Sequence, residues 1–187
     1  MADVVTALIL GNARTMEDEA NKLYELFEPD IVIGCNNAGM DWQDHVDHLF
    51  TLHPTKTENW PGVREAVRRR RISGRNIPIT WSNRAERGID YVIPDWRGST
   101  GLLAVNGALN YLECRAIVLA GVPMAAEFGH YGRQGNWKAA NLYRKGWKER
   151  RHEIAPFVRS MSGWTRELFG EPTLEWLDEM RRSANAT

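Results

Sequence analysis

The stretch DWRGSTGLLAVNGALNYLECRAIVLAGVPM, residues 95–124, says most about the fold of this chain. The small residues Gly98–Gly101 precede an apolar run, 100–112, that predicts a largely buried helix. The unbroken apolar run 116–120 that follows predicts a buried strand. We expect the hydroxyl side chains at the helix mouth to cap the helix, and its free backbone N–H groups to suit a phosphate. The two roles are compatible, because a helix N-terminus can be capped when empty and can bind an anion when filled.

Short apolar runs alternate with helical patterns along the rest of the chain. The runs that predict strands are 4–10, 31–35, 49–52, 77–81, 91–93, 116–120 and 158–162. Apolar spacing predicts helices over about 15–27, 60–71, 100–112, 137–157, 165–169 and 173–182. This alternation predicts a single Rossmann-like α/β domain over 1–187, with a mainly parallel sheet and helices on both faces. Within it we expect a short lid-like loop at about 123–137 and a helical C-terminal region at about 138–187.

The balance of acidic and basic residues excludes a strong overall electrostatic field. The chain has 187 residues, of which 24 are basic and 24 acidic, so its net charge does not draw it to nucleic acid or to a membrane surface. One local run, Arg68–Arg71, is strongly basic. This run fits either a solvated helix face or a contact with a phosphate-rich partner such as nucleic acid.

The cysteines and the N-terminus favour a cytoplasmic protein. Cys35 and Cys114 form no disulfide framework and lack metal-ligand spacing, so we expect buried free thiols in a reducing compartment. The first residues have no positively charged region before their apolar stretch, and that stretch is too short to cross a bilayer. We therefore interpret it as the first strand and expect no membrane span.

Glycine, asparagine and histidine recur where the predicted strands end. In α/β sheets, ligands bind beyond the carboxyl ends of the strands. The dipeptides at those ends are Gly11-Asn12, Asn36-Asn37, His53-Pro54, Ser82-Asn83 and Gly121-Val122. Gly11 permits close backbone approach, and the asparagines can donate and accept hydrogen bonds to a phosphate, a sugar or a base without carrying charge. The plainer alternative is that Asn12 and Asn36 are only turn residues.

Two histidines suit general acid or base chemistry better than the other three. His53 ends a predicted strand, and His130 lies in a glycine-flanked loop, although an ordinary loop histidine is the plain alternative. His45 and His48 lie among aspartates, but their spacing is weak for a metal, so we predict no metal site. His152 lies in a basic helical segment and is expected at the surface.

Two phosphate-binding signatures are missing from the sequence. It contains neither G-x-x-x-x-G-K-[ST] nor G-x-G-x-x-G. Their absence disfavours a P-loop nucleoside triphosphatase and an ordinary nicotinamide enzyme.

With these residues assembled, the chain resembles the bacterial lipooligosaccharide sialyltransferases and their pterin pyrophosphokinase-like relatives. The segments that carry the resemblance are 10–15, 34–36, 99–101 and 120–121. They correspond to a Gly-Asn turn after the first strand, a Cys-Asn end of the second, a Ser/Thr-Gly helix start and a strand that ends in glycine. The resemblance covers about residues 4–131.

The chain also resembles small proteins carried by phages and prophages. The shared features are a Thr-Leu-His-Pro turn, here 51–54, and a Ser-Met-Ser-Gly-Trp-Thr segment, here 160–165. This second resemblance runs nearly the full chain and implies no activity. If it reflects origin, the protein would work in the cytoplasm of a bacterial host.

The sialyltransferase resemblance implies a metal-independent reaction with a cytidine monophosphate sugar as co-substrate and no permanently bound cofactor. It implies that Asn12, Asn36 and Ser99-Thr100-Gly101 contact the nucleotide and its phosphate, together with Gly11 as the close-approach residue of the first turn. It also implies a histidine that takes the proton of the acceptor hydroxyl. His130, with His53 as the alternative, is the candidate for that role.

The chain departs from the family pattern at three places. Arg14 stands where the family has Gly-Pro-Ser and adds a cation beside the proposed anion site, so we place it among the phosphate-binding candidates. An Asn-Pro turn appears as His53-Pro54, and the shortened lid keeps only Tyr131. Trp137 and Trp96 offer rings that can stack on a base or sugar. The residues that we place as substrate-contact candidates are Asn37, Asp95, Trp96 and Tyr131.

Three functions follow as hypotheses. The first is a nucleotide-sugar-dependent glycosyltransferase that needs no metal. The second is a Mg²⁺-dependent pyrophosphoryl or phosphoryl transferase, with Asp41 and Asp95 as candidate metal ligands near strand ends. The third is a non-catalytic phage protein that binds a nucleotide or, through Arg68–Arg71 with Trp60 and Trp81 nearby, nucleic acid. The acceptor and the oligomeric state are not determined by the sequence.

Overall fold

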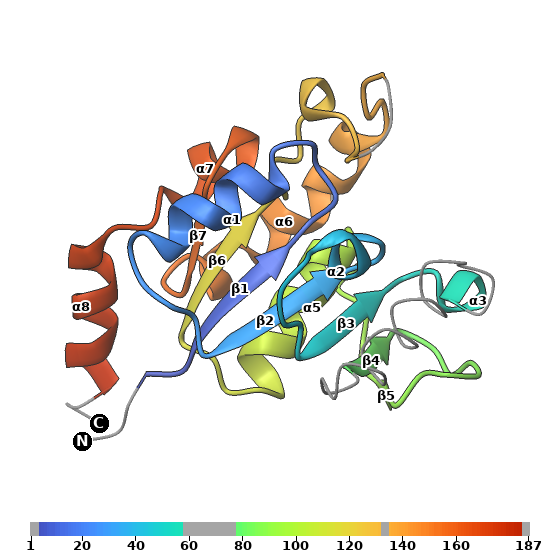
Figure 1. The fold of residues 1–187 in the computed structure, drawn as a ribbon, viewed down its shortest axis with the longest axis horizontal. Helices are drawn as coiled ribbons and strands as arrows, with labels where there is room; N and C mark the ends of the chain where they lie inside the picture. The colour runs from blue at the N-terminus through green and yellow to red at the C-terminus, as the bar shows by residue number, and fades with distance from the viewer. Residues whose placement is uncertain (1–3, 58–77, 132–134, 185–187) are drawn as a thin grey trace.

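The structure, a computed structural model, describes residues 4–57, 78–131 and 135–184. The seven strands of this part form one sheet in the order β5-β4-β3-β2-β1-β6-β7, and every neighbouring pair is parallel (Figure 1). The strands are β1 (Thr6–Leu10), β2 (Ile31–Cys35), β3 (His48–Thr51), β4 (Ile79–Ser82), β5 (Tyr91–Val92), β6 (Ala116–Ala120) and β7 (Val158–Ser160). The helices are α1 (Met16–Tyr24), α2 (Ala38–Asp41), α3 (Pro54–Thr57), α5 (Thr100–Asn110), α6 (Ala140–Ile154), α7 (Gly163–Phe169) and α8 (Leu174–Ala184), with a 3-10 turn η1 (Ala126–Phe128).

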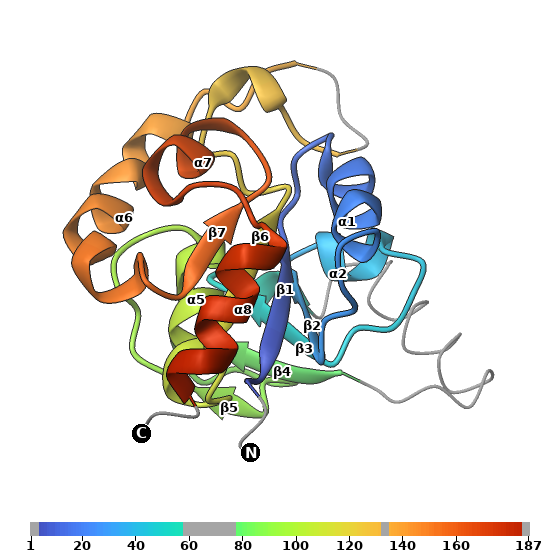
Figure 2. The same ribbon diagram turned by 90° about the vertical axis from the view of Figure 1, so that its left-hand side faces the viewer.

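Helices cover both faces of the sheet. Figure 2 shows α5, α6 and α7 on one side of the strands and α1 and α2 on the other. Along β1, Ala7 and Ile9 pack into the core beneath α5 and α6, whereas Leu8 and Leu10 pack beneath α1. Because both faces are buried, the central strands are unbroken apolar runs rather than alternating ones. The predicted Rossmann-like α/β fold with helices on both faces is confirmed, and the described sheet is entirely parallel.

The strand order reverses between β1 and β6. From β1 the chain moves outward through β2, β3 and β4 to β5, and α5 then returns it to β6 on the other side of β1. Ligands of doubly wound sheets bind in the crevice at such a reversal, outside the carboxyl ends of the strands. Here that crevice is bordered by the turn after β1 and the turn after β6, which begin at Gly11 and Gly121.

Local boundaries differ from the sequence-based prediction in two ways. The four-residue helices α2 and α3 follow β2 and β3 directly, and a single helical turn is too short to produce a periodic pattern. The helix expected over 137–157 is confined to α6. The helix expected over 60–71, with the basic run Arg68–Arg71, lies outside the described residues.

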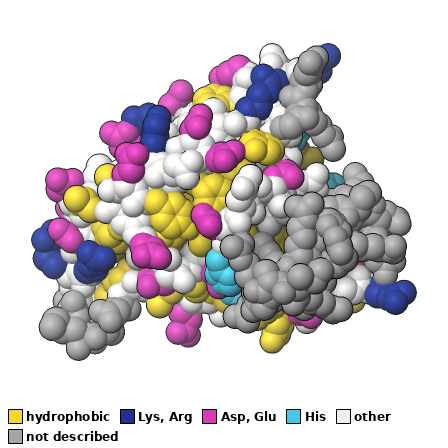
Figure 3. Space-filling model, viewed as in Figure 1, with side chains coloured by type: hydrophobic (Ala, Val, Ile, Leu, Met, Phe, Trp, Pro, Cys, Tyr) yellow, Lys and Arg dark blue, Asp and Glu magenta, His cyan; other side chains and the backbone are white. Residues whose placement is uncertain are grey.

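The distribution of charge on the surface and the state of the cysteines match the predictions from the sequence. Figure 3 shows acidic and basic side chains interspersed over the visible face. Cys35 and Cys114 are free and buried, as predicted, and burial raises the pKa of each thiol to about 12. Both thiols therefore stay protonated at neutral pH and are poor nucleophiles. Within the described ranges, every helix is too short or too polar to cross a membrane.

His48, at the start of β3, is held in its neutral form by its surroundings. The indole Nε1–H of Trp81 donates to His48 Nδ1 at 3.1 Å, so protonation of that nitrogen would oppose two N–H donors. Burial lowers the pKa of His48 below its ordinary value of 6.5, and the charge of Asp47 offsets this only in part. The unfolded chain, in which the ordinary value applies, therefore takes up this proton first as the pH falls.

We expect the free energy of unfolding to decrease as the pH falls below 6.5, because the unfolded state then binds more protons than the folded state. Urea denaturation on either side of this pH measures the slope. His48→Gln should remove this part of the slope, whereas His152→Gln, on an exposed turn of α6, should keep it. An unchanged slope in His48→Gln would contradict this account.

Candidate functional site

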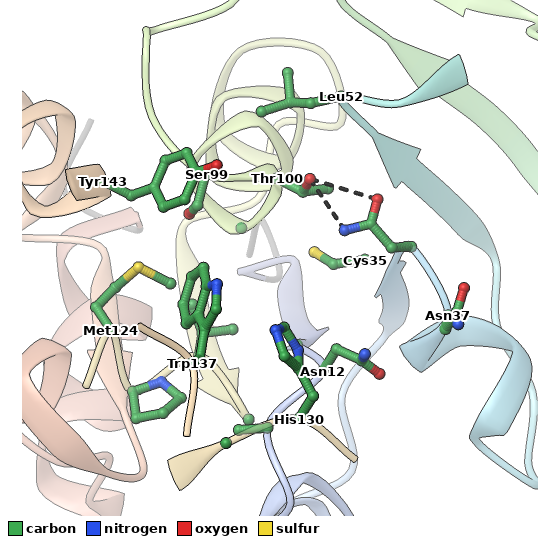
Figure 4. A pocket seen from close by; sticks show the side chains of 18 of the residues that line it. Asn12, Cys35, Asn37, Leu52, Ser99, Thr100, Met124, His130, Trp137 and Tyr143 are labelled. Carbon is green, nitrogen blue, oxygen red and sulfur yellow. Dashed lines mark hydrogen bonds between the residues drawn. The ribbon is translucent and has the colours of Figure 1, made fainter. Parts of the chain in front are cut away.

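A pocket of about 380 Å³ opens at the reversal of strand order (Figure 4). Its lining comes from the carboxyl ends of β1, β2, β3 and β6, from the N-terminus of α5, and from the loop between β6 and α6. Nine predicted site residues meet there: Gly11, Asn12, Asn36, Asn37, His53, Ser99, Thr100, Gly101 and His130. Segments more than 100 residues apart in sequence, such as Gly11 and His130, are thus joined in one cavity, as the strand-end rule predicts.

The base of the pocket depends on two glycines that cross at close range. A Cβ on Gly11 would lie 2.2 Å from the carbonyl oxygen of Gly121, and a Cβ on Gly121 would lie 2.5 Å from the carbonyl oxygen of Gly11. Gly121 also has a φ of 68°, in the left-handed region. Its N–H donates to Glu19 Oε2 at 2.7 Å, and Glu19 is a buried carboxylate on α1. This crossing brings the turns after β1 and β6 together.

The mouth of α5 is built differently from the predicted cap. Ser99 is the N-cap residue, and its backbone carbonyl accepts from the N–H groups of Leu102 and Leu103, but its hydroxyl makes no capping bond. Instead Ser99 Oγ accepts from the indole Nε1–H of Trp147 at 3.1 Å. The prediction that the serine and threonine hydroxyls cap this helix is therefore wrong. A fully buried tryptophan on α6 supplies a stronger local partner for Ser99 than the helix end does.

Thr100 and Asn36 lie side by side in the pocket lining and are joined by a hydrogen bond (Figure 4). Asn36 Nδ2 donates to Thr100 Oγ1 at 3.2 Å, and Asn36 Oδ1 accepts from the hydroxyl of Thr51 at 2.9 Å. Asn36 has a φ of 53°, a conformation that asparagine tolerates better than most residues. The side chain that follows β2 is thereby fixed to the end of β3 and to the start of α5.

An aromatic wall, made of His130, Trp137 and Tyr143, forms another part of the pocket lining. The rings of His130 and Trp137 lie 5.4 Å apart between centroids, and Trp137 stacks on Tyr143 at 5.6 Å with an interplanar angle of 22°. In Figure 4, Trp137 stands between His130 and Tyr143. His53 lines the pocket from the turn after β3. The site therefore combines imidazole groups and flat rings with a helix N-terminus in one pocket.

Asn12 carries an unsatisfied polar atom in the lining. Its Oδ1 is buried and has no hydrogen-bond partner among the described residues. A buried acceptor of this kind costs free energy unless a donor reaches it. A ligand hydroxyl or amino group would supply that donor.

Arg14 and Tyr131 lie beside the pocket and are not part of its lining. The Arg14 guanidinium donates to the backbone carbonyl of Gly135. Tyr131 donates its hydroxyl to Glu17 Oε2 at 3.0 Å, and this bond, with the charge of Glu17, raises the pKa of the tyrosine. Both side chains attach the loop that carries His130 to the first turns of the chain around α1, rather than reaching into the pocket.

Asp95 and Trp96 also lie outside the lining. Asp95 is exposed and accepts from Asn83 Nδ2 at 3.4 Å. Trp96 is half-buried, and the guanidinium of Arg150 stacks over its ring at 5.1 Å from the centroid. Neither of these predicted substrate-contact residues is brought to the pocket.

Carboxylates do not contribute to the described lining. Asp41, on α2, and Asp95 are both outside it. In residues 4–57, 78–131 and 135–184, no group of three or more His, Cys, Asp or Glu side chains is arranged to hold a metal ion. The described lining therefore contains no Asp, Glu, Lys or Arg side chain.

Some lining residues had no predicted role. Cys35 and Leu52 adjoin predicted strand ends, so the same strand-end rule could have found them. Met124 and Tyr143 have no such signal, because they reach the pocket only through the packing of the loop and of α6.

Comparison with family models, with curated proteins and with solved structures gave no match. The resemblance to the lipooligosaccharide sialyltransferases and to phage proteins therefore stays a prediction from sequence motifs. The fold and the pocket define a Rossmann-like α/β protein with a cavity at its topological switch point, and, among the described residues, no Asp, Glu, Lys or Arg lines that cavity.

Proposed function

We propose that the pocket binds a nucleotide sugar and transfers its sugar to a hydroxyl acceptor without a metal ion. The observation that carries this proposal is the pairing, in one pocket, of the α5 N-terminus with a wall of His130 and aromatic rings. The helix terminus suits a phosphate, and the rings suit a base or a sugar face. A cytidine monophosphate sugar is the donor that the sequence resemblance implies.

The reaction would move charge toward the helix terminus. The bond between the anomeric carbon and the phosphate oxygen breaks, and its electron pair stays on that oxygen. The acceptor oxygen bonds to the anomeric carbon, and its proton passes to an imidazole nitrogen of His130. Donors fixed beforehand at the mouth of α5 stabilise the phosphate most as the bond breaks, which lowers the barrier.

The two alternatives have less support from the described residues. Phosphoryl transfer through Mg²⁺ needs carboxylates close to the phosphates, and the predicted ligands Asp41 and Asp95 do not line the pocket. Binding of nucleic acid was expected through Arg68–Arg71, which lie outside the described residues.

The test is ligand-induced thermal stabilisation with nucleoside mono-, di- and triphosphates and nucleotide sugars, each with and without Mg²⁺. We expect a shift with a nucleotide sugar that does not depend on metal. Asn12→Ala and Ser99→Ala should each weaken binding about 10-fold, the effect of about one lost hydrogen bond. Asn21→Ala, at an exposed position on α1, is the matched control and should not weaken it.

Three outcomes would contradict the proposal. A shift only with a triphosphate and Mg²⁺ would favour phosphoryl transfer. Binding of a nucleotide sugar without release of free nucleotide in the presence of any hydroxyl acceptor would favour a binding protein. An unchanged melting temperature with every compound would show that the pocket does not bind the proposed ligand.

A further inference from the structure

The hydroxyl of Ser99 is oriented by a donor that cannot accept. Trp147 Nε1–H lies 3.1 Å from Ser99 Oγ, and an indole nitrogen only donates. Ser99 Oγ must therefore accept this bond, and its own proton must be directed elsewhere. Ser99 is 7% exposed and lines the pocket, and no described residue supplies an acceptor for that proton.

The hydroxyl of Thr100 is oriented by a chain of hydrogen bonds that begins at the backbone. The N–H of His53 donates to Thr51 Oγ1 at 2.9 Å, and the hydroxyl of Thr51 donates to Asn36 Oδ1 at 2.9 Å. This bond fixes the amide of Asn36, so that Nδ2 faces Thr100 Oγ1 at 3.2 Å.

A hydrogen bond in the opposite direction, from the Thr100 hydroxyl to Asn36, is less favourable. Thr100 Oγ1 lies 3.5 Å from Asn36 Oδ1, which is longer than its separation from Nδ2, and Oδ1 already accepts from Thr51. Thr100 Oγ1 therefore accepts from Asn36, and its proton is free to point into the pocket. Thr100, like Ser99, is 7% exposed and lines the cavity.

We propose that the mouth of α5 is a donor-only seat for a phosphate group, and that Asn36, Thr51 and Trp147 are positioning residues for it. Both hydroxyls receive a hydrogen bond from the framework and offer their protons to the pocket. The first N–H groups of a helix add donors that have no partner within the helix. Such a seat selects acceptor oxygens and disfavours a hydroxyl or amino group in the same place. This phosphate seat rests on the proposed function, which supplies the identity of the complete ligand.

Thr51 and Asn36 allow this relay to be tested apart from direct contact. Thr51 does not line the pocket, so Thr51→Val can affect a ligand only through the two lining residues that its hydroxyl contacts, Asn36 and the backbone of His53. Asn36→Asp replaces the donor Nδ2 with an oxygen, which would attract the proton of Thr100 and add a negative charge. Aspartate also tolerates the left-handed backbone at this position.

The measurement is isothermal titration with inorganic phosphate, pyrophosphate, cytidine 5′-monophosphate and cytidine. We expect Asn36→Asp to weaken binding of the three phosphate probes about 100-fold, and Thr51→Val about 5-fold, with little change for cytidine. Thr51→Ser should restore the phosphate affinity because it keeps the hydroxyl. Asn110→Asp, at the far end of α5, controls for charge, and Thr80→Val, on β4, controls for loss of a strand hydroxyl.

The outcomes separate this inference from the proposed function. Phosphate affinities unchanged in Asn36→Asp and Thr51→Val, or no binding of any phosphate probe to the wild type, would overturn the relay. A parallel loss of cytidine affinity and of the melting temperature would also overturn it, since it would indicate a structural role. If phosphate probes respond as expected and no nucleotide sugar is consumed, the seat stands and the proposed transfer fails. If sugar transfer occurs and Thr51→Val changes nothing, the transfer stands and the relay fails.

Discussion

Gly121→Ala is expected to lower the free energy of unfolding by about 2–5 kcal/mol, the sum of overpacking and of left-handed backbone strain. The added Cβ would lie 2.5 Å from the carbonyl oxygen of Gly11 and 2.6 Å from Met16 Cβ. Neither neighbour is the flexible end of a side chain, so the backbone of β1 or the start of α1 must shift. The crossing at the base of the pocket would open, and ligand binding should be lost with stability.

Gly88→Ala is the matched control for that prediction. Gly88 also has a positive φ, 82°, but a Cβ there would meet nothing within 4 Å. It should therefore show the backbone strain alone, about 1–2 kcal/mol. Urea denaturation of the two variants measures the difference. Equal losses of stability would show that the contact between the two turns contributes nothing.

His130→Gln is expected to reduce the rate of sugar transfer about 10²–10⁴-fold, the usual contribution of a general base. The glutamine keeps hydrogen-bonding capacity and removes the group that can take the acceptor proton. The proposed phosphate contacts are at the mouth of α5 and glutamine keeps a polar side chain in the wall, so the dissociation constant of the nucleotide should change far less than the rate of transfer. Timed assays of nucleotide release measure the rate of transfer, and titration of the nucleotide measures its dissociation constant.

Two further histidine variants show whether the effect belongs to His130. His152→Gln, exposed on α6, should leave the transfer rate unchanged. His53→Gln should have the smaller effect of the two lining histidines, because His53 lies at the turn after β3, whereas His130 belongs to the aromatic wall. A full loss of transfer in His53→Gln with an active His130→Gln would reassign the base to His53.

The strand-end rule accounts for what could be predicted of the pocket. Asn12, Asn36 and His53 each follow an apolar run that is recognisable without a structure, and parallel strands bring such positions to one edge. Asp95 was predicted as a residue near a strand end, and Trp96 as a ring that can stack on a ligand. Neither reaches the pocket, because Asp95 is exposed and pairs with Asn83, whereas Trp96 packs against the hydrophobic core beneath Arg150. Nearness along the chain sets no side-chain direction in an irregular segment.

The sequence by itself determined the layered fold and the edge of the sheet at which a ligand can bind. Unbroken runs such as Ala116–Ala120 can be stable only when both faces of a strand are covered, and this requirement is local. Only the tertiary structure decided how the polar groups of the pocket are directed. Ser99 had a local preference to cap α5, but Trp147, 48 residues away, supplies an indole N–H that would otherwise be buried without a partner. The cost of leaving that buried donor unpaired outweighs the gain from a cap, and it turns the serine hydroxyl toward the pocket.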